Sequence, residues 1–137
     1  MKLKCLALIV LSFGLLSGPV WNVYAENAKP EARTWLNENK SRFCALATNR
    51  FGDRETAKEF VEKLYKMGAV EVKVDNIMDE KWRIEEEGGP YADTLLVKLP
   101  KDSKQRAEIF KLQEKEVDST ELIENDKGQE EIVFWWD

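Results

Sequence analysis

The sequence contains no histidine and only two cysteines among its 137 residues. Without an imidazole, the chain cannot carry out Ser-His or Cys-His nucleophilic catalysis and cannot hold a metal through histidine. Two cysteines are too few for a four-thiolate zinc site, and no CxxC motif is present. We therefore expect a protein that is not an enzyme and that uses neither a metal nor a cofactor.

Positive charge is also in short supply. The chain has 21 lysines and arginines against 26 aspartates and glutamates, for a formal net charge of −5. Nucleic acids and anionic membranes attract basic surfaces, so neither is expected as the main partner. Cys44 is the only cysteine beyond the N-terminal segment, and the apolar residues around it indicate a buried structural thiol rather than a reactive one.

Residues 1–25 have the pattern of a secretory signal peptide. Two lysines give a positive start, residues 5–16 form an uncharged apolar run, and Ala25 ends a Val-Tyr-Ala sequence that suits signal peptidase. The run is shorter than the about 20 residues that span a bilayer. We expect cleavage after Ala25, a periplasmic or secreted protein free of the membrane, and a single domain over residues 26–137. The alternative is an uncleaved N-terminal anchor.

The helical segments are marked by caps and by apolar stripes. Residues 54–67 place apolar side chains at helical spacing, Asp53 is a suitable N-cap, and Gly68 suits a left-handed C-terminal position. Weaker patterns predict a helix over residues 30–40 and another over residues 104–116.

Strand patterns occur in several segments. Residues 42–48 and 94–99 are apolar on both faces and too short for helices, whereas residues 70–75 alternate between valine and charged side chains. Residues 121–124 and 130–136 flank an Asn-Asp-Lys-Gly turn, which predicts a C-terminal hairpin.

The long connection over residues 76–93 has no single clear pattern. A further short strand with Trp82 and Ile84 facing inward is one interpretation. The acidic run at residues 85–87 offers oxygen ligands for Ca²⁺ or a carboxylate pair for glycoside hydrolysis, but its spacing matches no EF-hand loop. A solvated acidic loop is the simpler interpretation. The Gly-Gly-Pro turn that follows is either a flexible connection or a mobile loop that presents Tyr91 to a partner.

The order of these elements predicts an α+β fold. A strand-helix-strand unit repeated twice with right-handed crossovers resembles the ferredoxin-like (βαββαβ) sandwich, here with an extra N-terminal helix and a C-terminal hairpin. The first and third strands of that sandwich are central, and they correspond to the two segments that are apolar on both faces.

This resemblance covers residues 42–137 and concerns the fold alone, which carries many functions. Ferredoxin-like metal chaperones have a CxxC motif where this chain has Asn-Arg-Phe-Gly at residues 49–52. RNA-binding members display aromatic residues on both central strands, where this chain offers only Phe43. Neither activity is therefore expected.

Tryptophan is the most informative residue type for function. In an alternating strand Trp135 and Trp136 face opposite sides of the sheet, so both are buried only if the N-terminal helix that carries Trp35 closes the second face. Otherwise one of them is exposed, and large exposed aromatic side chains mark binding surfaces. The last strand is also an edge open to β-addition unless residues 121–124 cover it.

These patterns favour an exported, non-enzymatic domain that binds a protein or peptide, as an inhibitor, immunity or accessory factor. Its candidate binding residues are Trp82, Tyr91, Trp135 and Trp136. The acidic balance favours a basic partner through electrostatic steering. Two alternatives stay open. One is a small-molecule sensor that works as a sheet-paired homodimer. The other is a hydrolase with carboxylate catalytic groups, or a Ca²⁺ binder, that uses residues 79–93.

Overall fold

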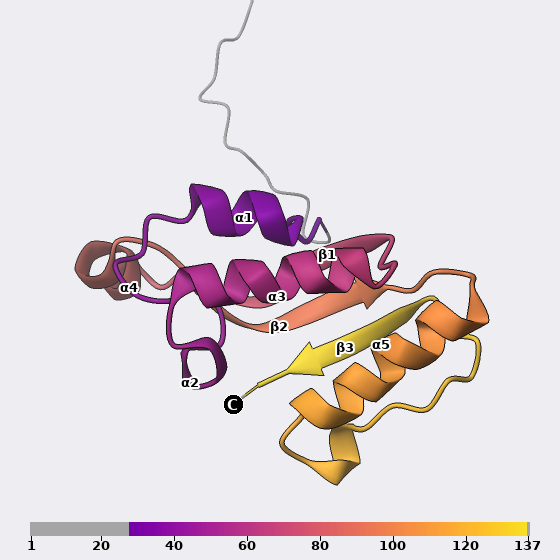
Figure 1. Cartoon of the computed structure of the whole chain (residues 1–137). Coiled ribbons are helices and arrows are strands. Elements are labelled where there is room, and N and C mark those ends of the chain that lie inside the picture. The colour runs from indigo at the N-terminus through magenta and orange to yellow at the C-terminus, as the bar shows by residue number, and fades with distance from the viewer. Residues whose placement is uncertain (1–27, 137) are drawn as a thin grey trace, which may run out of the picture.

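The structure, a computed structural model, describes residues 28–136, so the predicted signal peptide at residues 1–25 lies outside it. Its elements in chain order are α1 (Ala32–Glu38), α2 (Thr48–Phe51), α3 (Arg54–Lys66), β1 (Glu71–Met78), α4 (Lys81–Glu87), β2 (Tyr91–Lys98), α5 (Ser103–Glu116), the short 3-10 helix η1 (Thr120–Leu122) and β3 (Glu131–Trp135). The strands form an antiparallel sheet in the order β1-β2-β3 (Figure 1). The predicted α+β class is confirmed.

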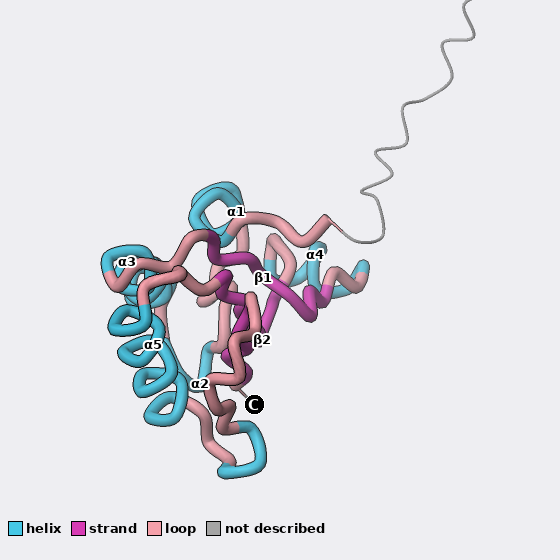
Figure 2. Tube along the Cα trace, turned by 90° about the vertical axis from the view of Figure 1, so that its right-hand side faces the viewer, coloured by secondary structure: helices cyan, strands magenta, loops and turns pink. Residues whose placement is uncertain are grey.

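The sheet has one covered face and one open face. Helices α3 and α5 lie on the covered face, and α1 packs beside α3 and β1 (Figure 2). The side chains that point toward these helices are fully buried: Val72, Val74, Leu95, Val97, Ile132 and Phe134. Their register across the three strands places them on one surface, as the valine alternation of β1 predicts.

The helix caps act as the sequence predicts. Asp53 begins α3 by accepting a hydrogen bond from the Thr56 backbone N–H at 2.8 Å, and Gly68 follows its end with a φ of 105°. Asp102 begins α5 in the same way by accepting from the Gln105 N–H. The apolar stripe of α3 is buried, and it consists of Ala57, Phe60, Val61 and Leu64.

The predicted strand over residues 42–48 is wrong. This segment is a loop followed by α2, and within the described chain its only ladder contact is an isolated parallel bridge between Leu46 and Ala92. Its alanines and Leu46 are still buried, because a loop packed against the start of β2 excludes water as a strand does. Within residues 28–136 the sheet therefore has three strands, without the fourth, central strand of a ferredoxin-like sandwich.

The inward-facing strand considered within residues 76–93 is also wrong. Residues 81–87 form α4, at the end of the sheet away from α5 (Figure 1). Trp82 and Ile84 are exposed rather than buried. In the acidic run Glu85 and Glu86 are exposed and Glu87 is half-buried, and two of these residues form ion pairs at helical spacing, Lys81–Glu85 and Arg83–Glu87.

Side chains, rather than a hairpin, cover the outer edge of β3. Residues 121–124 contain η1 instead of the predicted hairpin strand, because Gln113 binds their backbone at the Leu122 carbonyl and the Glu124 N–H. The Val133 N–H donates to Glu124 Oε1 at 2.9 Å, and Gln113 Nε2 donates to the Val133 carbonyl at 3.0 Å. These bonds occupy the edge groups of Val133 that β-addition would use.

Candidate functional site

Trp136, one of the four candidate binding residues, belongs to the core. Its side chain is 2% exposed, and its ring centroid lies 5.2 Å from that of Phe51 and 5.7 Å from that of Phe60, both edge-to-face. These contacts join the end of β3 to α2 and α3. Trp136 therefore packs the interior and lies outside the surface that a partner can reach.

Trp135 faces the opposite side of the sheet, as the alternation predicts. It is 36% exposed, and its indole Nε1 donates to Asp93 Oδ2 at 3.3 Å. The same carboxylate accepts hydrogen bonds from the Asn76 and Thr94 side chains. Helix α1, which carries Trp35, packs against α3 and β1 and leaves Trp135 uncovered. One tryptophan is thus held in place on the open face.

Arg83 brings the candidate residues Trp82 and Tyr91 together. Its guanidinium carbon lies 4.5 Å from the centroid of the Trp82 ring and 5.4 Å from that of the Tyr91 ring. Glu80 and Glu87 bind the same guanidinium at 3.0 and 3.1 Å, and the Arg83 side chain is only 14% exposed. These contacts fix α4, which buries none of its own residues, to the start of β2.

The loop before α2 is pinned from both sides. Arg54 Nη1 donates to the Asn39 carbonyl at 2.6 Å, and Arg54 Nη2 donates to the Ser41 carbonyl. On the other side, the Arg42 N–H donates to the Glu87 carbonyl at 2.7 Å and ties the loop to the end of α4. These bonds occupy backbone groups of Asn39, Ser41 and Arg42 and fix the chain at the start of this segment.

Two glycines pack tightly against the same loop. A Cβ on Gly88 would lie 2.8 Å from the Lys40 carbonyl oxygen, and a Cβ on Gly89 would lie 2.7 Å from the Ser41 nitrogen. Any other residue at either position would have to push this backbone aside. The Gly-Gly-Pro turn is therefore a packed junction between α4 and the loop, rather than a flexible connection.

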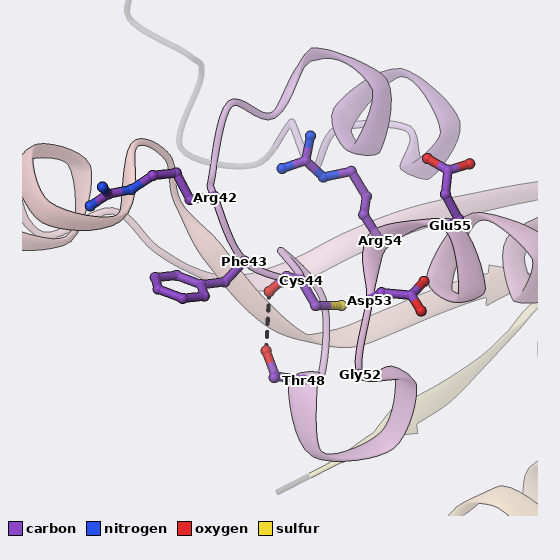
Figure 3. Close-up of a pocket in the computed structure, with 8 residues that line it drawn as sticks. All are labelled: Arg42, Phe43, Cys44, Thr48, Gly52, Asp53, Arg54 and Glu55. Carbon is purple, nitrogen blue, oxygen red and sulfur yellow. Dashed lines mark hydrogen bonds between the residues drawn. The ribbon is translucent and has the colours of Figure 1, made fainter.

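A groove runs across the loop and contains Phe43, which is 59% exposed. It consists of two hollows that share Phe43, Cys44 and Thr48. The hollow on the α3 side has a volume of about 390 Å³ and is shown in Figure 3. The hollow on the α4 side has a volume of about 360 Å³ and reaches Met78 and Tyr91. We call the two together the Phe43 groove.

Exposed apolar side chains gather around α4. The large hydrophobic residues exposed in the described chain are Phe43, Val70, Ile77, Trp82, Ile84, Val133 and Trp135. Four of them lie on α4 or on the segments beside it, and we call these four the α4 patch: Phe43, Ile77, Trp82 and Ile84. Val133 and Trp135 lie apart from the patch on the open sheet face.

Three members of the α4 patch, Phe43, Ile77 and Ile84, are absent from the candidate residues that the sequence indicates. The pattern placed Phe43 on a central strand and Ile84 on an inward-facing one. For Ile84 a usable signal was present, because the ion-pairing residues of α4 are four apart, which is typical of a helix surface. Nothing local to Phe43 distinguishes an exposed position from a buried one.

Cys44 forms a buried, protonated part of the groove wall. Its Sγ donates to the Leu46 carbonyl at 3.0 Å, and the residue is buried as predicted. Burial is the main reason that the pKa of this thiol is raised; the Asp53 carboxylate raises it further, whereas the Leu46 backbone and Arg54 act in the opposite direction. The thiol is therefore not activated.

Within residues 28–136, no three Cys, Asp or Glu side chains converge in a way that would hold a metal ion. The helices of this part of the chain are also too short or too polar to cross a membrane. No known protein family matches the chain, and comparison with curated proteins and with solved structures finds no similar protein. The α4 patch and the Phe43 groove are therefore the features from which a function can be inferred.

Proposed function

We propose that this protein is an exported, non-enzymatic domain that binds a protein or peptide through the α4 patch. The observation that carries the proposal is that four of the exposed large apolar side chains lie on, or on segments beside, a helix that buries none of its own residues. Clusters of exposed aromatic residues supply much of the binding energy at protein interfaces. The Arg83 stack holds Trp82, and the pinned loop holds the backbone of Phe43, which lowers the entropy cost of association.

The charges around the patch favour a basic partner. Between residues 79 and 87 the acids Asp79, Glu80, Glu85, Glu86 and Glu87 outnumber the bases Lys81 and Arg83. Both bases already pair with glutamates of the same segment, so the patch keeps an acidic rim. A second copy of the chain would bring like charge to this surface, whereas a segment rich in lysine or arginine would be attracted to it. Salt should weaken that attraction.

Peptide selection tests this proposal without a known partner. Random peptides displayed on phage and selected on the protein, purified after expression of its full chain, should combine aromatic or aliphatic residues with lysine or arginine. Replacing both Trp82 and Ile84 by alanine should weaken binding of the selected peptides by about ten-fold or more, because truncating a central interface residue costs about 1–2 kcal/mol. The readout is the dissociation constant at low salt.

Val70→Ala is the matched control for this experiment. That side chain is 57% exposed, about as much as any member of the patch, but it lies outside the patch. We expect its binding to equal that of the unaltered protein. Selection of acidic peptides, or equal binding by the Val70 and the Trp82/Ile84 variants, would contradict the proposed surface.

Export predicts a specific N-terminus for the purified protein. After expression of the full chain in a Gram-negative bacterium, the product should lie in the periplasmic fraction and begin at Glu26, because Val-Tyr-Ala precedes that residue. N-terminal sequencing measures this directly. A product that keeps Met1 and sediments with the membranes would identify the segment as an anchor instead.

A further inference from the structure

Phe43 divides the groove with a side chain whose backbone is fixed. The Ser41 carbonyl accepts from Arg54, and the Phe43 N–H donates to Ser41 Oγ at 3.2 Å. The ring itself is exposed, and holding its backbone in advance leaves little entropy to lose on binding. Phe43 is therefore suited to be an anchor with a subsite on either side.

The hollow on the α4 side is an apolar subsite. Phe43, Met78 and Tyr91 supply its carbon surface. The two charged residues at its margin bind each other, since Arg83 pairs with Glu87 at 3.1 Å. A hydrophobic side chain that enters this hollow would leave water without leaving either charge unpaired.

The hollow on the α3 side favours a cation. Its charged residues are Arg42, Asp53, Arg54 and Glu55. The Arg54 guanidinium is engaged by two loop carbonyls, and Figure 3 shows Arg42 directed away from Asp53. Asp53 and Glu55 are exposed at this hollow, whereas Arg54 is half-buried and already bound to the loop. A lysine or arginine side chain would therefore complement this hollow.

The arrangement of the hollows favours an extended chain. The two hollows share the exposed Phe43, so a segment that fills both must place one side chain in each and pass over the ring. In an extended chain, alternate side chains lie on the same side and about 7 Å apart. The residue between them points away, which leaves room for the Phe43 ring.

We propose that the Phe43 groove binds an extended segment of the partner in which a large apolar residue and a lysine or arginine are separated by one residue. The apolar side chain fills the hollow on the α4 side, and the cation lies beside Asp53 in the hollow on the α3 side. This inference rests on the proposed function and specifies the sequence that binds at Phe43, the residue that the groove shares with the α4 patch.

Short synthetic peptides test this motif. Peptides of glycine and serine that contain Phe-Ser-Lys or Lys-Ser-Phe, blocked at both ends, are titrated calorimetrically at low salt, and the tighter of the two gives the direction of the chain. Exchanging its lysine for glutamate should weaken binding by about ten-fold or more, since it places a carboxylate beside Asp53. Placing phenylalanine and lysine next to each other should have a similar effect, because the two side chains then point to opposite sides.

Variants of the protein separate the two subsites. Phe43→Ala should weaken the lysine peptide by about ten-fold while leaving the melting temperature unchanged, because the ring is exposed. Asp53→Asn keeps a good N-cap for α3. The Asp53→Asn variant should bind the lysine peptide several-fold more weakly and bind a Phe-Ser-Ser peptide as tightly as the unaltered protein does. Glu59→Gln, an exposed position on α3 outside the groove, is the control and should bind like the unaltered protein.

The outcomes distinguish this inference from the proposed function. Unchanged binding by Phe43→Ala, or equal binding of the lysine and glutamate peptides, would overturn the inference. If the phage-selected peptides then still depended on Trp82 and Ile84, the proposed function would stand and its partner would use another part of the α4 patch. If the synthetic peptides did not depend on Phe43 and the phage-selected peptides did not depend on Trp82 and Ile84, both proposals would fail.

Discussion

Replacing Trp136 with alanine is expected to lower the free energy of unfolding by about 3–5 kcal/mol, the usual cost of truncating a large aromatic side chain in a core. The residue is buried and packs edge-to-face on Phe51 and Phe60. Its removal would leave a cavity where β3 meets α2 and α3. This is a large share of the about 5–15 kcal/mol that stabilises a typical domain. Chemical denaturation followed by circular dichroism measures the change.

Trp135→Ala is the matched control, one residue away in the chain. Its ring is partly exposed on the open face, so its removal should cost about 1 kcal/mol or less. Trp136→Phe adds a second comparison, because Trp136 Nε1 is buried without a hydrogen-bond partner among the described residues. Removing that unpaired N–H should offset part of the lost packing. Equal destabilisation by the two alanine variants would contradict the assignment of the two sheet faces.

Replacing Arg54 with alanine should both destabilise the protein and weaken peptide binding. The variant leaves the carbonyls of Asn39 and Ser41, both in buried residues, without their guanidinium partner. An unpaired buried polar group costs about 1–3 kcal/mol, so we expect the two carbonyls to cost about 2–6 kcal/mol together. The released loop would no longer fix Phe43, and the lysine peptide should bind about ten-fold more weakly.

Hydrogen exchange measures the loop separately from global stability. In the Arg54 variant the amides of residues 41–44 should exchange faster, relative to those of β2, than in the unaltered protein. Lys63→Ala is the control, since that side chain is exposed on the same helix and should change the free energy of unfolding by about 0.5 kcal/mol or less. If the loop amides exchange equally in both variants, Arg54 is not what holds the loop.

Local sequence patterns were sufficient to predict the helices and strands that are amphipathic. Helix α3 was predictable because Asp53 caps it and its apolar stripe has helical spacing, and β1 was predictable because valine alternates with charge. The structure of residues 42–48 was not predictable in this way, because a packed loop and a central strand are equally apolar. The contacts that fix the start of this segment come from Arg54, which is more than ten residues away in the chain and binds the carbonyl groups of Asn39 and Ser41.

The candidate site was predictable only in part. The sequence places Trp82 and Tyr91 on either side of one turn, and the structure joins them through Arg83. Ile84 was misplaced because the two-residue spacing from Trp82 suits a strand as well as a short helix. The exposure of Phe43 was not predictable at all, since it depends on bonds from α3 and α4 to the loop that carries it.

An NMR titration of the isotope-labelled protein with the lysine peptide tests the role of the α4 patch most directly. The backbone amide shifts should change most over residues 42–48, 53–55 and 78–91, which contain the Phe43 groove and α4. Changes concentrated over residues 94–98 and 131–135 would place the binding surface on the open face of the sheet, and would contradict the function proposed for α4.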